Sequence, residues 1–172
     1  MGTGRKASAV VVAGLVVGAV SGVALGVVWW QLAPRVPLIV QPGTTFPETY
    51  QPEGYLAADV AFGALAAVAG VVVTIGLANM RRDHLLSVLI AGLLASAVGT
   101  TAMWFVGTRL GSVDIEGLSA TTTEDLVVDA PLKVSMPGMF LMWALAAAAV
   151  VTILALGDWV NEVRSQRREA GR

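Results

Sequence analysis

The chain has 172 residues, of which 56% are hydrophobic and 13% are charged, and its formal net charge is −1. Together with a mean hydropathy of +0.74, this composition excludes an ordinary soluble domain and predicts a membrane protein. The sequence has no cysteine, which excludes disulfides, thiolate metal sites and lipid anchors attached to cysteine.

Four long apolar runs follow one another along the chain, and each is 22 to 24 residues long. Because a helix needs about 20 apolar residues to cross the hydrocarbon core, each run predicts one transmembrane helix. We therefore expect an all-α membrane protein, with a single four-helix domain of residues 1–172 arranged as two hairpins. The runs cover residues 7–30, 56–78, 85–106 and 136–157.

Basic residues divide unequally between the two sides of the predicted bundle. The side that holds both chain ends carries eight of the eleven Lys and Arg residues. Because short loops rich in Lys and Arg stay in the cytoplasm, we expect a multi-pass protein of the plasma membrane with both termini cytoplasmic. The outer loops are then residues 31–55 and 109–135. Residues 158–172 form a cytoplasmic tail whose arginines meet the anionic surface of the lipid bilayer rather than nucleic acid.

Glycines recur every fourth residue in the first predicted helix, at Gly14, Gly18, Gly22 and Gly26. They share one helix face, and their missing side chains let another backbone approach closely, which favours helix association in a bilayer. We expect this helix-packing face to lie against the second, third or fourth helix. A homo-oligomer and docking on another protein of a membrane complex are the alternatives.

The third predicted helix repeats part of this spacing. Gly92, Ser96, Thr100 and Trp104 follow three of these glycines and Trp30 at a constant offset of 74 residues. This match suggests a duplicated hairpin, with the two copies related by an axis along the membrane normal.

The two outer loops contain short stretches typical of β-strands. Residues 36–40 read VPLIV, and residues 125–134 read DLVVDAPLKV. We expect the two stretches to pair into a short β cap above the bilayer. Pro37 and Pro131 favour edge positions in such a sheet, because proline cannot donate a hydrogen bond to a neighbouring strand.

Four charged residues of the outer side form a candidate polar site: Arg35, Glu53, Asp59 and Arg109. Asp59 is the only ionisable residue within an apolar run and is expected in the first turn of its helix, where the helix dipole favours an anion. A second hypothesis pairs Asp59 with Arg35 or Arg109. The two arginines serve either as anchors that reach the headgroups or as a joint site for a phosphate or carboxylate group.

Tryptophans mark the predicted membrane boundaries. Trp29, Trp30, Trp104 and Trp143 lie toward the outer ends of their runs, and Trp159 lies at the inner end of the last run. Aromatic residues at these positions are typical of the belts that membrane proteins place at the headgroup level.

No catalytic, cofactor-binding or metal-binding pattern is found, and the predicted membrane interior offers hydroxyl groups as its main polar side chains. We expect a structural or accessory component of a membrane complex rather than an enzyme. A small oligomeric transporter or channel is the alternative, and a membrane enzyme that acts on lipid or cell-wall precursors is a third reading. The hydroxyl-bearing residues are Ser21, Thr74, Ser96, Thr100, Thr101 and Thr152.

The motifs WWQLAPRVP after the first helix and PEGYLAADVAFGALAAVAG at the start of the second resemble a family of small membrane proteins of unknown function from actinobacteria. The resemblance covers about residues 20 to 75, and Pro52, Glu53, Ala58, Asp59 and Phe62 match the family motif. It implies a four-helix protein of the plasma membrane and carries over no catalytic residue.

Overall fold

The computed structural model describes residues 2–41, 44–47, 52–80 and 84–170, with side chains at 8–41, 55–80 and 84–169. The first helix is α1 (Gly2–Leu32), and two strands follow, β1 (Pro37–Gln41) and β2 (Thr44–Pro47). The remaining elements are α2 (Pro52–Met80), α3 (Leu85–Leu110), α4 (Ile115–Thr121), β3 (Leu126–Asp129), the 3₁₀ helix η1 (Pro137–Leu141) and α5 (Met142–Ala170).

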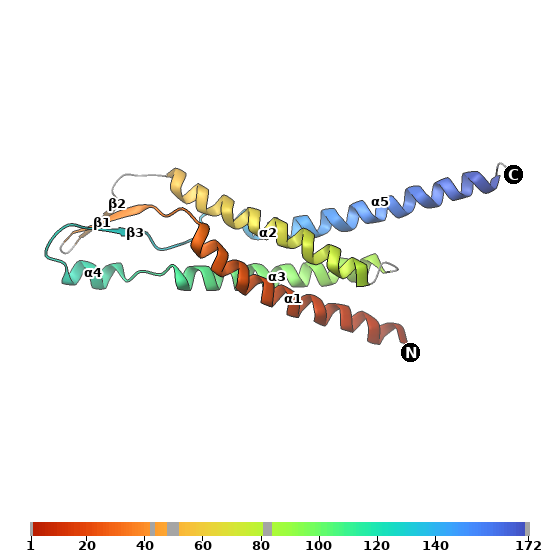
Figure 1. The fold of residues 1–172 in the computed structure, drawn as a ribbon, viewed down its shortest axis with the longest axis horizontal. Coiled ribbons are helices and arrows are strands. Elements are labelled where there is room, and N and C mark those ends of the chain that lie inside the picture. The colour runs from red at the N-terminus through yellow and green to blue at the C-terminus, as the bar shows by residue number, and fades with distance from the viewer. Residues whose placement is uncertain (1, 42–43, 48–51, 81–83, 171–172) are drawn as a thin grey trace.

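Four helices, α1, α2, α3 and α5, are long and apolar enough to cross a membrane, as the sequence predicts. They run side by side in an elongated molecule, with the strands and α4 gathered at one end and both chain ends toward the other (Figure 1). We call the strands, α4 and the described residues that connect them to one another and to the long helices (33–36, 111–114, 122–125 and 130–136) the cap. We call the end of the bundle that meets the cap the cap end. We call the opposite end, toward which both chain ends lie, the terminal end.

The helices are longer than the apolar runs that predict them. The fourth run differs most, because it begins as the short η1 helix at Pro137 and its helix α5 continues to Ala170. Proline fits the first turn of a helix, where its missing N–H would have no partner within the helix. At the other end no proline or glycine interrupts the polar residues after Gly157, so the helix continues past the apolar run.

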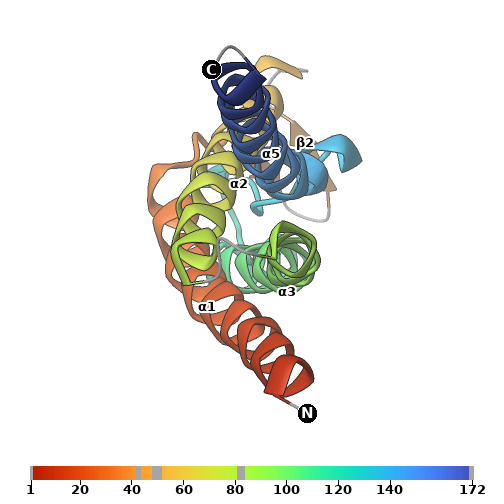
Figure 2. The same cartoon turned by 90° about the vertical axis from the view of Figure 1, so that its right-hand side faces the viewer.

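The bundle consists of two pairs of parallel helices. Along α1, Gly14, Gly18 and Gly22 meet Ala91, Ala95 and Gly99 of α3 in the same order. Gly63 and Gly70 of α2 likewise meet Met139 of η1 and then Trp143 of α5. Viewed along the bundle, α2 and α3 lie between α1 and α5 (Figure 2).

The strands form one antiparallel sheet in the order β2-β1-β3. Leu38 of β1 pairs with Pro47 of β2 and with Val128 of β3, so the strands predicted within residues 36–40 and 125–134 do pair. The edge position expected for Pro37 is wrong, because β1 is the central strand. Pro37 is the first residue of β1 and pairs with β3 alone, a position where its missing N–H interrupts no ladder.

Two tryptophans expected in the headgroup belts are instead buried in the helix bundle. Trp29 and Trp143 are both fully buried. The indole of Trp29 lies over Gly107 of α3, and a Cβ atom added to Gly99 would lie 2.5 Å from Cη2 of Trp143. Both indoles fill space that glycines leave open on α3, and the belt prediction is therefore wrong for these two residues.

The two stripes that suggest a duplicated hairpin contact different neighbours. The glycines of α1 face α3, whereas a Cβ atom added to Gly92 of α3 would face Thr74 of α2 and Ala147 of α5. The residues of α3 that receive the α1 glycines are Ala91, Ala95, Gly99 and Met103, which lie on another face of α3. The residues that match between the first and third helices in the sequence therefore do not have equivalent contacts in the fold.

Candidate functional site

Asp59 joins the cap to the bundle. Its side chain is fully buried, and its carboxylate accepts three hydrogen bonds from two backbone N–H groups. Ser135 N donates to Oδ1 at 2.9 Å and to Oδ2 at 3.1 Å, and Met136 N donates to Oδ2 at 2.8 Å. A buried carboxylate is tolerated when hydrogen-bond donors replace the water it has lost.

The position of Asp59 differs from both sequence-based expectations. Helix α2 begins at Pro52, so Asp59 lies beyond the first turn. Within the described residues, no arginine lies within ion-pair distance of its carboxylate. Ser135 and Met136 directly precede η1, and Asp59 of α2 therefore fixes the point at which the chain leaves the cap and enters the last helix.

Arg35 lies three residues after the end of α1, between Trp30 and Asp129. Its Nη2 donates to the carbonyl oxygen of Trp30 at 3.1 Å, and its guanidinium carbon lies 5.8 Å from the centre of the Trp30 ring. Its Nη1 lies 3.8 Å from Oδ2 of Asp129 at the end of β3. Trp30, Gln31, Ala33, Arg35 and Asp129 line a shallow surface depression. Within the described chain, the buried Nε1 of Trp30 has no hydrogen-bond partner.

The other two residues of the candidate polar site have separate surroundings. The guanidinium of Arg109 lies 5.0 Å over the ring of Phe105, one turn earlier on α3, and both side chains are exposed. Glu53 is the second residue of α2, but its side chain lies outside the described residues. The structure thus gives Arg35, Asp59 and Arg109 three different sets of neighbours, and nothing in it joins the two arginines into one site.

An aromatic cluster supports the junction between the bundle and the cap. The rings of Trp29 and Phe62 lie 5.0 Å apart and meet edge to face, and the ring of Phe140 lies 5.3 Å from that of Phe62. The indole N–H of Trp29 donates to the carbonyl oxygen of Ala58 at 3.0 Å. Since Leu132 of the cap packs in the same cluster, the cap is held by apolar packing as well as by Asp59.

The backbone of the cap is also tied to the bundle and to itself. Leu132 N donates to the carbonyl oxygen of Gly111 at 3.1 Å, and Ala130 N donates to that of Val36 at 2.8 Å. Asp114 caps α4, a helix the sequence did not reveal, by accepting from Gly117 N at 3.0 Å. The bond from Leu132 attaches residues 130–136 to the end of α3, and the bond from Ala130 joins them to residues 33–36. The cap therefore continues the bundle.

The surface of the cap is acidic and has an apolar edge. Strand β3 is an edge strand of the described sheet, and its residues Leu126 and Val127 are exposed, Val127 by 62%. Acidic side chains surround this strand and α4, and all of them are exposed: Asp114, Glu116, Glu124, Asp125 and Asp129. The arrangement offers main-chain hydrogen bonds, apolar side chains and negative charge at one edge.

The interior of the bundle contains few polar groups, and two of its buried hydroxyls bond to their own helix. Ser96 donates to the carbonyl oxygen of Leu93, and Thr100 donates to that of Ser96, one turn earlier on α3. Thr74 Oγ1 and Trp143 Nε1 are buried, and neither has a hydrogen-bond partner among the described residues. These groups do not form a continuous polar path along the bundle.

No group of three or more His, Cys, Asp or Glu side chains in the described part of the chain could hold a metal ion. Comparison with models of protein families, with curated proteins and with solved structures finds no match. The resemblance to an actinobacterial family therefore stays a prediction, and the argument for function rests on the geometry of the cap and the bundle.

Proposed function

We propose that this protein is a structural or accessory component of a membrane complex, and that its cap is the surface on which a partner docks. In this proposal the four long helices cross the plasma membrane, both termini lie in the cytoplasm, and the cap faces outward. The unequal division of Lys and Arg supports this orientation, because basic loops are retained on the cytoplasmic side. Large apolar side chains that are exposed along all four helices support contact with lipid.

The exposed edge of β3 carries the proposal. An extended segment of a partner can add to such an edge through main-chain hydrogen bonds, and Leu126 and Val127 would supply apolar contacts. Glu124, Asp125 and Asp129 surround the edge with negative charge, which favours a partner with a basic segment. The edge of a sheet presents N–H and C=O groups without partners, and a docked segment would pair with those of β3.

The interior of the bundle supports an accessory role over transport. Solute and ion carriers place ionisable residues near the middle of the membrane, whereas the buried hydroxyls of Ser96 and Thr100 here bond to their own helix. The close packing of α1 on α3 and of Trp143 between α2 and α3 fills the space that a path through one copy would need.

A photo-reactive side chain placed at Val127 in native membranes tests the proposal. We expect cross-linking to a partner chain from Val127 and little from Thr121, an exposed control position on α4. Reversing the charge of Glu124 and Asp125 together, each to Lys, should reduce the cross-linked product about tenfold, since like charges across an interface disfavour binding. Equal cross-linking from both positions, or no effect of charge reversal, would contradict the proposal. Capture of only a second copy would favour an oligomeric transporter or channel.

A further inference from the structure

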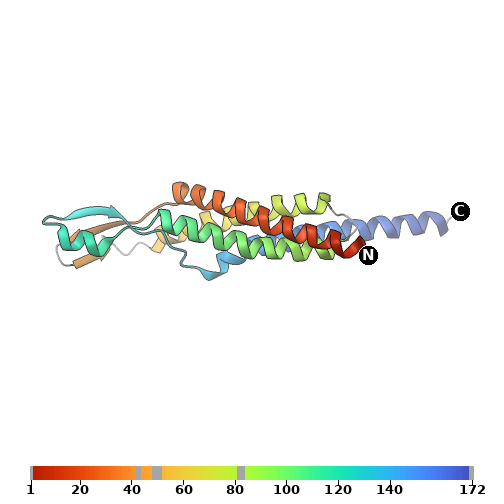
Figure 3. The ribbon, with the colours of Figure 1, turned by 90° about the horizontal axis from the view of Figure 1, so that it is seen from below.

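Helix α5 extends well past the other helices at the terminal end. Figures 1 and 3 show its last turns alone beyond the bundle. No residue between Ala155 and Glu169 is buried, and at about 1.5 Å per residue this segment is about 22 Å long. An isolated helix of this length is marginal in water, and most helices are stabilised by packing of one face.

One face of α5 packs on the bundle, and the opposite face is apolar and uncovered. Trp143, Ala147 and Val151 are buried against the other helices. Leu156 follows Ala147 by nine residues, about two and a half turns at 3.6 residues per turn, and so it points away from the bundle. Leu156 and Trp159 are 56% and 62% exposed.

Six residues on this side of α5, five of them exposed and one half-buried, are spaced as in a coiled coil. Their separations along the chain alternate between four and three residues, which is the spacing of the a and d positions of a heptad repeat. Three of the residues lie well inside the apolar run, and the other three lie near or beyond its end at Gly157. We call this set the α5 seam, and its members are Leu145, Ala149, Thr152, Leu156, Trp159 and Val163.

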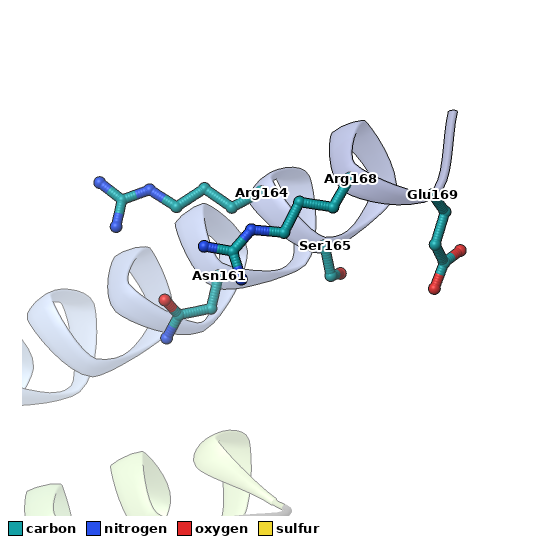
Figure 4. A pocket seen from close by; sticks show the side chains of 5 residues that line it. All are labelled: Asn161, Arg164, Ser165, Arg168 and Glu169. Carbon is teal, nitrogen blue, oxygen red and sulfur yellow. The ribbon is translucent and has the colours of Figure 1, made fainter. Parts of the chain in front are cut away.

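Polar residues occupy the other side of the projecting segment. Asn161 follows Ala147 by 14 residues, which is about four turns. It therefore lies on the same side of α5 as Ala147, the side that packs on the bundle earlier in the helix. Asn161, Arg164, Ser165, Arg168 and Glu169 line a surface there that this helix alone forms, as Figure 4 shows. The projecting helix is therefore polar toward the side of its own bundle and apolar toward the outside.

We propose that a second copy of this chain docks along the α5 seam, so that two α5 helices form a parallel coiled coil. With Leu156 and Val163 at a and Trp159 at d, Glu162 takes a g position and Arg167 the following e position. In a parallel pair, a g residue faces the e residue five positions later on the partner. Glu162 of each copy then meets Arg167 of the other, and both side chains are exposed in the single copy.

The position of α5 in the bundle leaves the seam accessible. Helix α5 lies at one side of the bundle and α1 at the other (Figure 2). Two copies in one membrane have the same orientation, which makes their α5 helices parallel, as the pairing of Glu162 with Arg167 requires. This pairing does not depend on the proposed role of the cap, because the two surfaces lie at opposite ends of the molecule.

Cysteine cross-linking of the full chain in its native membranes tests the seam without background, because the protein has no cysteine. Single cysteines replace Leu156, Trp159 or Val163, and matched controls replace Asn161 or Ser165 on the polar face. We expect about tenfold more cross-linked dimer at the three seam positions than at the controls, since a and d residues face one another across a coiled coil. A profile without this periodicity, or seam positions that meet lipid alone and give no dimer, would overturn the proposal.

Charge reversal at the flanking positions provides a second test that leaves the seam intact. With a cysteine at Leu156 as reporter, Glu162→Arg and Arg167→Glu should each reduce the dimer about threefold, and the double variant should restore it. Arg168→Glu is the control, because Arg168 lies on the polar face (Figure 4), and it should leave the yield unchanged. If the double variant is no better than either single variant, the paired copies do not have the proposed register.

Discussion

The two parallel helix pairs of this bundle are packed by opposite means. Helix α1 approaches α3 backbone against backbone, because Gly14, Gly18 and Gly22 face Ala91, Ala95 and Gly99. Helix α5 instead places one large buried side chain, Trp143, in the space between α2 and α3. The Trp143 backbone lies against Gly70, and its ring lies against Gly99.

This difference predicts which substitutions each contact will tolerate. A contact between backbones leaves no room for added atoms, because a backbone cannot rotate away as a side chain can. A contact made by one large ring tolerates little removal, because its packing partners are left facing a cavity. The α1–α3 pair should therefore be sensitive to enlargement, and the packing of α5 on α2 and α3 should be sensitive to truncation of Trp143.

The largest effect is expected for Gly22→Leu in α1. A Cβ atom at Gly22 would overlap the carbonyl oxygen of Gly99, and at Gly18 it would lie 2.6 Å from that of Ala95. A leucine would separate α1 from α3, and we expect loss of the folded bundle, measured as loss of a cooperative melting transition in mild detergent. The matched control is Gly76→Leu in α2, where an added Cβ atom meets nothing within 4 Å. Equal melting of both variants would show that the glycine contact is unimportant.

Truncation of Trp143 should have the next largest effect. Trp143→Ala removes a fully buried ring, and substitutions of this kind cost about 3 to 5 kcal/mol in folding free energy. Trp104→Ala, at a tryptophan that is 39% exposed, should cost less than half as much. Thermal melting of the two variants side by side checks the order. The opposite order would mean that Trp143 contributes little to the packing of α5 on α2 and α3.

A smaller effect is expected at Asp59, which fixes the entry to α5. Asp59→Ala leaves the N–H groups of Ser135 and Met136 without their carboxylate acceptor, and unpaired buried donors cost about 1 to 3 kcal/mol. Glu124→Ala, at an exposed acid of the cap, is the control and should change the melting temperature little. Hydrogen exchange at Ser135 and Met136 should also accelerate in Asp59→Ala. Unchanged exchange there would contradict the role assigned to Asp59.

The smallest effect is expected for the ion pair between Arg35 and Asp129. The two side chains are 24% and 62% exposed, and pairs of this kind contribute about 0 to 1 kcal/mol. Arg35→Ala should therefore lower the melting temperature only slightly. Exchanging the charges of Arg35 and Asp59 should not restore stability in the double variant, because the structure does not pair them. Recovery in that double variant would show that the two residues interact after all.

Part of the candidate site was predictable from the sequence and part was not. The spacing of the α1 glycines defines one helix face without reference to any partner, and the four apolar runs define the long helices. The carboxylate of Asp59 could not be assigned a partner, because its donors are backbone groups 76 and 77 residues away, and backbone N–H groups leave no signature in the sequence. The positions of the tryptophans were equally ambiguous. A tryptophan that packs against a glycine of a neighbouring helix cannot be told in the sequence from a tryptophan at a membrane boundary.

The sequence by itself determined the number of long helices, the strands β1 and β3 of the cap and the polar extension after Gly157, because these follow from apolar length and local pattern. It did not reveal β2. Only the tertiary structure decided that the α1 glycines face α3 and that Trp29 and Trp143 are buried. It also decided that the seam of α5 is left uncovered by its own bundle. The physical reason is that in an apolar chain nearly every helix face could be buried against any other. Shape complementarity between whole helices, rather than hydrophobicity, selects among them.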